Sequence, residues 1–153
     1  MNTLTKPVAT SETRKVDQLL AHYGESHRNP RNEAIHYVAI PLIMLSLIGL
    51  LFALHPWAAY GFLAASMVYY ARLSMVFLFV MAALSGVALL LVHVMGDRVL
   101  PLSAAIFVAA WIAQFVGHKI EGRKPSFFED LQYLWVGPLF VLSRLFIRLG
   151  LRW

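Results

Sequence analysis

The segment IHYVAIPLIMLSLIGLLFAL, residues 35–54, decides the fold because its twenty residues include no charged side chain. An α-helix needs about 20 predominantly apolar residues to cross the hydrocarbon core of a bilayer. Three more apolar stretches follow, at about 57–71, 73–95 and 102–118. The second and fourth are close to the lower length limit, so tilted helices or a locally thinned bilayer are expected. The pattern predicts an all-α integral membrane protein with four transmembrane helices.

The composition supports the same class. Hydrophobic residues make up 59% of the 153 residues and charged residues only 14%, whereas soluble domains carry roughly a quarter charged residues. The chain has no cysteine, which excludes disulfides, thiolate nucleophiles and cysteine-ligated metals. The net charge of +5 comes from basic residues that border the apolar stretches. We therefore expect anionic lipid headgroups as partners and no nucleic acid.

The two ends of the chain differ from these stretches. Residues 1–10 are predicted to form a flexible tail and residues 11–153 a single membrane-embedded domain. Apolar residues at helical spacing from Val16 to Tyr23 predict an amphipathic helix before the first span. Near the other end, Arg144, Arg148 and Arg152 recur every four residues, which predicts a basic helix lying in the membrane interface. A fifth spanning helix is the alternative for this last segment.

The basic residues also indicate the orientation in the membrane. With four spans and a cytoplasmic N-terminus, twelve of the thirteen Lys and Arg residues face the cytoplasm and Arg98 alone lies outside. This bias is typical of membrane proteins. The first 34 residues contain no apolar core of a cleaved signal peptide, so none is expected. A bacterial inner membrane is the predicted location.

This topology sorts the histidines by depth. His55 and His93 fall near the outer ends of spans, whereas His36 begins the first span and His118 ends the fourth. His36 and His118 therefore share one level at the cytoplasmic face. His27 precedes His36 by nine residues and reaches the same level if the NPRN segment turns back.

A carboxylate accompanies these imidazoles. Glu121 follows His118 by three residues, so a continued helix places both on one face. His27, His36, His118 and Glu121 together predict a metal site, and a set of His and Glu without thiolate suits iron(II), manganese or zinc. His22 also lies on the inner side and is interpreted as an interfacial anchor.

Several polar residues flank the predicted ligands. Asn29 is expected to cap a helix that starts at Pro30, and Asn32, one turn before His36, to orient its ring. Gln114, one turn before His118, either contacts a ligand or makes a helix–helix hydrogen bond. Two basic residues after Glu121 are either interfacial anchors or partners of a substrate carboxylate. They are Arg123 and Lys124.

Two motifs carry a family resemblance. HRNPRNEAIH…IP (27–41) and WIAQFVGHKIEGRKP (111–125), together with PLFVLSRLFIRLG (138–150), resemble the small membrane 2-hydroxy-fatty-acid dioxygenases. The resemblance implies an enzyme that uses iron(II), Fe(2+), and dioxygen to convert a 2-hydroxy fatty acid into a fatty acid one carbon shorter. It also implies that His27, His36 and His118 hold the iron.

Two positions depart from the family pattern. Glu121 follows the histidine of the second motif at three residues, where the family has four, and Arg144 stands where the family often has an acidic residue. An alternative function is that of a non-catalytic or zinc-dependent membrane protein that acts on or binds lipids. A haem protein with two axial histidines is a weaker alternative, because its ligands are expected inside the spans rather than at their ends.

Overall fold

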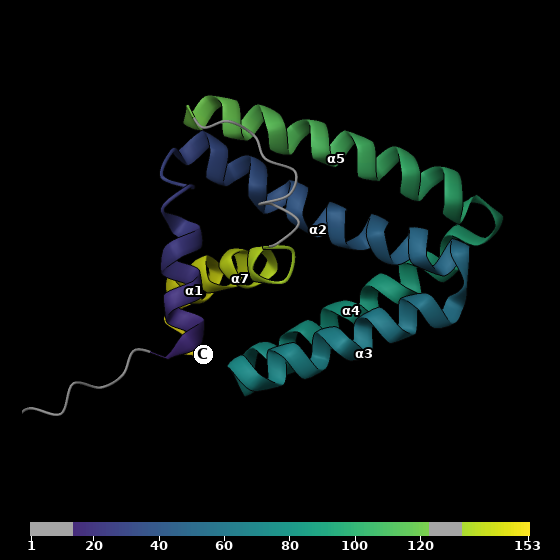
Figure 1. Cartoon of the computed structure of the whole chain (residues 1–153), viewed down its shortest axis with the longest axis horizontal. Coiled ribbons are helices and arrows are strands. Elements are labelled where there is room, and N and C mark those ends of the chain that lie inside the picture. Colours follow the sequence, from purple (N-terminus) through teal and green to yellow (C-terminus); the bar gives the residue numbers. More distant parts are fainter. Residues whose placement is uncertain (1–13, 123–132) are drawn as a thin grey trace, which may run out of the picture.

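The computed structural model describes residues 14–122 and 133–153, and these residues form helices without any strand (Figure 1). In chain order they are α1 (Lys15–Gly24), α2 (Pro30–Leu54), α3 (Pro56–Leu73), α4 (Met75–Met95), the 3₁₀ turn η1 (Gly96–Arg98), α5 (Val99–Glu121) and α7 (Val136–Leu149). The four predicted apolar helices are confirmed as α2, α3, α4 and α5. The predicted tail lies outside the described residues.

Local sequence signals set the ends of these helices. Asn29 caps α2 by accepting a hydrogen bond from the Arg31 backbone N–H at 3.0 Å, and Pro30 occupies the first helical position. The ring of His55 caps α3 in the same way, with Pro56 following it. Gly122 ends α5 with a φ of 77°, a left-handed conformation that favours glycine. The turns between the helices are therefore fixed by short motifs.

The helices form an antiparallel pair, a hairpin and a crossing element. α2 and α5 lie side by side along their length. α3 and α4 form a hairpin that packs against the C-terminal half of α2 (Figure 1). α1 runs across the other end of the molecule and packs on α7. Val16, Leu20 and Tyr23 of α1 join Leu139 and Phe140 of α7 in the largest core cluster, which confirms the predicted amphipathic helix.

Much of the outer surface is apolar. Large hydrophobic side chains point outward from α3, α4 and α5, among them Val68, Phe79, Leu90, Val108 and Ile112. Two segments, Pro30–Leu54 and Met75–Glu121, are long and apolar enough to cross a membrane, and the second contains both α4 and α5. These features agree with the predicted membrane protein, while the number of spans stays a prediction.

The C-terminal helix is short. α7 has 14 residues, which corresponds to about 21 Å of helix, and this is less than a single span requires. The length favours the predicted interfacial helix over the alternative of a fifth span.

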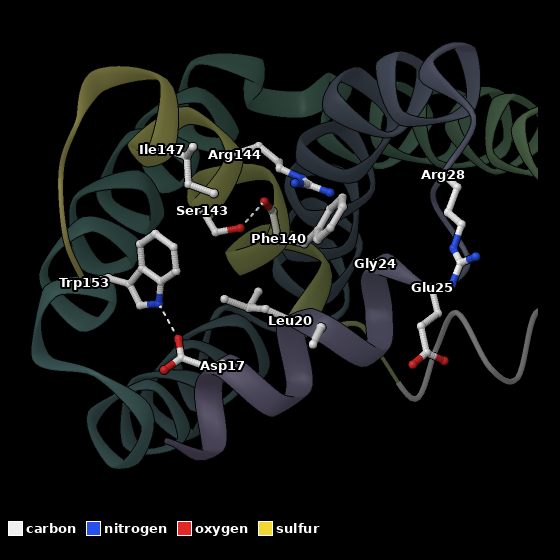
Figure 2. A pocket seen from close by; sticks show the side chains of 11 residues that line it. Asp17, Leu20, Gly24, Glu25, Arg28, Phe140, Ser143, Arg144, Ile147 and Trp153 are labelled. Carbon is white, nitrogen blue, oxygen red and sulfur yellow. Dashed lines mark hydrogen bonds between the residues drawn. The ribbon is translucent and has the colours of Figure 1, made fainter. Parts of the chain in front are cut away.

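A cavity of about 420 Å³ with several charged residues in its wall lies between α1 and α7 (Figure 2).

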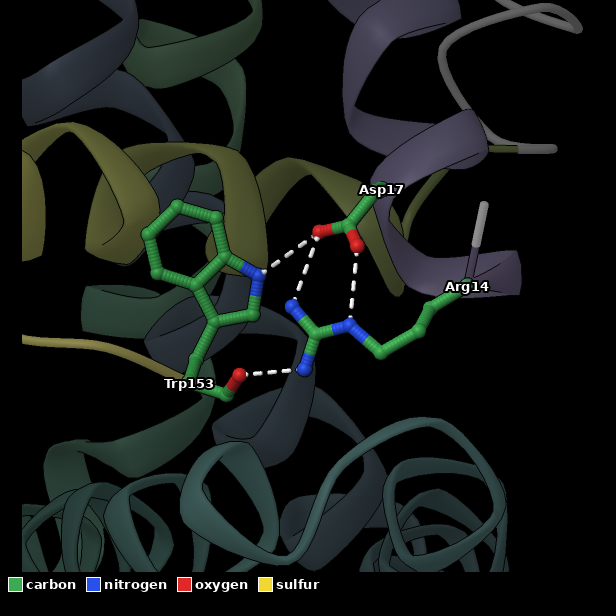
Figure 3. Close-up of polar contacts among 3 residues, drawn as sticks. All are labelled: Arg14, Asp17 and Trp153. Carbon is green, nitrogen blue, oxygen red and sulfur yellow. Dashed lines mark hydrogen bonds and ion pairs between the residues drawn. The ribbon is translucent and has the colours of Figure 1, made fainter. Parts of the chain in front are cut away.

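A polar contact joins α1 to the segment after α7 (Figure 3). The Trp153 indole N–H donates to Asp17 Oδ1 at 3.1 Å, and the Arg14 guanidinium donates to the Trp153 carbonyl. Arg14 also pairs with Asp17 at 2.8 Å. Because Arg14 is largely exposed, this ion pair contributes about 0–1 kcal/mol. The two hydrogen bonds to Trp153 are the contacts that connect α1 with the segment after α7.

Candidate metal centre

Three histidines that are far apart in the sequence meet in the interior. His27 comes from the loop between α1 and α2, His36 from α2 and His118 from α5. One ligand nitrogen from each lies within 4.8 Å of the other two. All three side chains are buried, with exposures of 3%, 0% and 6%. The predicted convergence of these three imidazoles is therefore present in the structure.

Backbone carbonyls set the tautomer of two of the rings. His27 Nδ1 lies 2.8 Å from the Tyr23 carbonyl, and His36 Nδ1 lies 2.9 Å from the Asn32 carbonyl. A carbonyl can only accept, so each Nδ1 carries the proton and each Nε2 carries the lone pair. A histidine that binds a metal through one ring nitrogen usually donates the N–H of the other nitrogen to such an acceptor. The donor set suits a divalent transition metal, because neutral imidazole nitrogens are among its preferred ligands.

Aromatic rings enclose one side of the centre. The Tyr23 ring stacks on His27 with centroids 4.3 Å apart and planes 13° apart. Phe140 of α7 lies 5.5 Å from the same imidazole. The sequence placed Tyr23 on the apolar face of α1, but it gave no sign that this face ends against a histidine. Phe140 was also not predicted, since only packing brings α7 to this site.

Gly117 permits α5 to approach α2 at the centre. A Cβ at this position would stand 2.4 Å from Asn32 Oδ1 and 3.3 Å from His36 Cε1. Asn32 is fully buried. A side chain at residue 117 would therefore separate His118 from His36 or displace Asn32.

Glu121 joins the two helices next to the histidines. Its Oε1 accepts from the Arg28 backbone N–H at 2.9 Å, and its Oε2 accepts from the Asn29 N–H at 2.9 Å and from Asn32 Nδ2 at 3.0 Å. The carboxylate thus lies at the N-terminus of α2, where backbone N–H groups favour a negative charge. It is not part of the three-histidine group, and its role as a ligand stays a prediction.

The other predicted polar residues are placed as follows. Asn29 caps α2 as expected. Asn32 orients His36 through its backbone carbonyl rather than its side chain, which bonds to Glu121 instead. Gln114 is buried one turn before His118 and lines a cavity of about 20 Å³ together with Tyr23. Arg123 and Lys124 lie outside the described residues.

The remaining histidines have ordinary surroundings. His22 is exposed and lies 3.6 Å from Glu25. His55 caps α3, and His93 bonds to the Leu89 carbonyl on an exposed part of α4. None of these three joins the metal-type cluster in the described part of the chain.

Fold and centre together define a small, apolar helical protein with a buried three-histidine site of metal-binding type. The sequence profile described as 2-hydroxy-palmitic acid dioxygenase Mpo1-like matches residues 13–149, and the chain belongs to this family. The chain is also 28% identical over 138 residues to the 2-hydroxy-palmitic acid dioxygenase MPO1 of Saccharomyces cerevisiae. That alignment covers 86% of this chain and 79% of the yeast protein. No solved structure matches the chain.

Proposed function

We propose that this protein is an iron(II)-dependent dioxygenase that shortens a 2-hydroxy fatty acid by one carbon. The observation that carries the proposal is the convergence of three buried imidazoles in a chain of the Mpo1-like family. His27, His36 and His118 would hold the metal. Bound iron(II) would supply the coordination positions at which dioxygen and the hydroxy-carboxylate end of the substrate meet.

The overall reaction needs no further reductant. The bond between C1 and C2 of the acid breaks, C2 is oxidised from an alcohol to a carboxyl carbon, and C1 leaves as carbon dioxide. These changes release four electrons, which reduce one dioxygen to two oxygen atoms at the oxidation level of water. The products are the shortened fatty acid, carbon dioxide and water, and all atoms and electrons are accounted for. The reaction therefore needs no reductant and no second cofactor besides the iron.

The protein's own groups prepare the site for this chemistry. The Tyr23 and Asn32 carbonyls keep the Nδ1 protons in place, so that the lone pairs of His27 and His36 point from Nε2. Tyr23 and Phe140 exclude water from the His27 side. Glu121 fixes the start of α2 against the end of α5. Arg123 and Lys124 remain our proposed partners for the substrate carboxylate.

We further propose that α2, α3, α4 and α5 cross a bacterial inner membrane and that α7 lies in its cytoplasmic interface. The apolar outer surface supports this arrangement. It places the histidines at the boundary between lipid and cytosol. One end of the substrate interacts with a cation and the other with hydrocarbon, so this depth suits both.

The test is reconstitution of the purified protein with iron(II) without oxygen, followed by 2-hydroxypalmitate and air. Mass spectrometry should detect a fatty acid one carbon shorter. His36→Ala and His118→Ala should abolish product and lower bound metal from about one per chain to none. His93→Ala is the matched control, because His93 is exposed and does not belong to the three-histidine group.

A zinc-dependent lipid hydrolase is the second candidate, because three histidines with an open position are also a catalytic zinc set. Zinc occupancy in the native protein, with no oxygen uptake on 2-hydroxy acids after iron loading, would favour that candidate. Product formation with iron and not with zinc would exclude it.

A further inference from the structure

We propose that the apolar groove between α2, α4 and α7 holds the alkyl tail of the 2-hydroxy fatty acid. This inference rests on the proposed function and names where its substrate binds. The groove has a volume of about 380 Å³, which lies within the range of small-molecule sites. Of its fifteen lining residues, Ser85 is the single polar one. Such a wall favours hydrocarbon and offers nothing to a charged headgroup.

The groove adjoins a small cavity beside the histidine centre. Ile40 and Met44 line both the groove and the cavity of about 20 Å³ that Tyr23 and Gln114 also line. Tyr23 stacks directly on His27. Ile40 also lies one helical turn after His36 on α2. Ile40 therefore lies between the histidine centre and the groove, and we infer that a tail leaving the centre passes this residue.

The groove also has a direction and a length. Ile40 packs in one core cluster with Met81, near the histidines, whereas Ile48 packs in another cluster with Ala88. His36 and Ile48 are twelve residues apart on α2, or about 18 Å along the helix axis. A tail that starts at the histidines and follows the groove reaches Ala88 only if it is long. Ala88 therefore lies in the distal half.

The second cavity near the centre has the wrong chemistry for a tail. The cavity between α1 and α7 is similar in size, about 420 Å³, but Asp17, Glu25, Arg28 and Arg144 form part of its wall (Figure 2). Methylene groups bound there would remove these charged groups from water and offer no hydrogen bond or ion pair in exchange, which is unfavourable. The lining therefore favours the groove of α2, α4 and α7 over this charged cavity.

The first test blocks the distal half of the groove. In Ala88→Phe, turnover of 2-hydroxypalmitate should fall by about tenfold or more, while turnover of 2-hydroxyoctanoate should stay within about twofold, because the short tail ends before residue 88. Ala83→Phe adds the same ring at an exposed position of α4 that does not line the groove and should change neither rate. Equal effects of Ala88→Phe on both acids, or no effect on either, would overturn the inference.

A second measurement needs no variant. A 2-hydroxy fatty acid with a diazirine near its methyl end should crosslink to peptides that contain residues 44–48 or 84–91. Excess unlabelled 2-hydroxypalmitate should suppress this labelling. Labelling confined to the wall of the charged cavity would place the tail there instead. Labelling that unlabelled acid does not reduce would mean that bulk lipid covers the groove. Either result would overturn the inference.

The two proposals fail in different ways. Wild-type protein that oxidises neither acid would refute the proposed function, whatever the crosslinking shows. Wild-type protein that oxidises both acids, with unchanged chain-length preference in Ala88→Phe, would refute only the tail site.

Discussion

A glycine lets α2 and α5 pack closely at each end of this helix pair. We call these the histidine end, which contains His36 and His118, and the turn end, where η1 leads into α5. At the histidine end, a Cβ at Gly117 would stand 2.4 Å from Asn32 Oδ1. At the turn end, a Cβ at Gly49 would stand 2.0 Å from Ser103 Oγ and 3.0 Å from Ser103 Cβ. Both glycines let the helices approach closely. In the described part of the chain, the group of three buried imidazoles lies at the histidine end alone, so close packing by itself does not make a site.

The difference lies in what the neighbouring segment contributes. The loop between α1 and α2 delivers His27 and two backbone N–H groups to the histidine end, and the latter bind Glu121. At the turn end, the apolar side chains of Ile48 and Val92 pack nearby. The comparison therefore predicts that matched substitutions at the two ends have separable effects on metal binding and on stability.

The largest effect is expected for Gly117→Ala. The methyl group must displace Asn32 or push His36 away from His118, because it meets both residues. Affinity for the metal should fall by about 100-fold, the upper range for disturbing the surroundings of metal ligands. Titration with iron(II) or zinc, followed by elemental analysis after gel filtration, measures this. Wild-type affinity in Gly117→Ala would show that the close approach is not needed for the site.

A smaller effect is expected for Glu121→Ala, which removes a carboxylate that accepts three hydrogen bonds. If Glu121 only positions the histidines, affinity should fall by about tenfold, with one metal per chain still bound at saturation. Glu121→Gln should recover part of the loss because one oxygen remains. X-ray absorption on the wild-type protein is the control. Loss of an oxygen ligand in Glu121→Ala would instead make this residue a ligand.

The smallest effect on the site is expected for Gly49→Ala. Overpacking at the turn end should lower the free energy of unfolding by about 1–3 kcal/mol and leave metal stoichiometry unchanged. Thermal unfolding in detergent, followed by circular dichroism, measures the stability. The double variant Gly49→Ala, Ser103→Gly should recover most of it, since the added methyl then fills the space of the removed side chain. A loss of metal in Gly49→Ala would contradict the separation between the two ends.

Local signals made the helices predictable. The apolar run from residue 35 to 54 and the Asn29-Pro30 and His55-Pro56 pairs fix α2 and its neighbours within a few residues, because capping acts over one helical turn. The proximity of His36 and His118 was predicted by counting apolar helices, because α2 begins and α5 ends on the same side of the predicted membrane.

The details of the centre depended on packing between distant segments. The spacing of Glu121 from His118 allows both ligation and the contact with Arg28 and Asn29, and only the path of the α1–α2 loop decides where the carboxylate goes. The backbone role of Asn32 was hidden for a similar reason, since a residue one turn before a histidine can act through its side chain or its carbonyl. Phe140 reaches His27 only after α7 has packed.

The order of the three histidines in the chain also bears on how the protein matures. His27 and His36 leave the ribosome early, but His118 follows His36 by 82 residues. α3 and α4 must be synthesised and α5 must fold back along α2 before the third imidazole arrives. The three-histidine group therefore forms late in biogenesis, and a nascent chain that stops before α5 holds only two of its imidazoles.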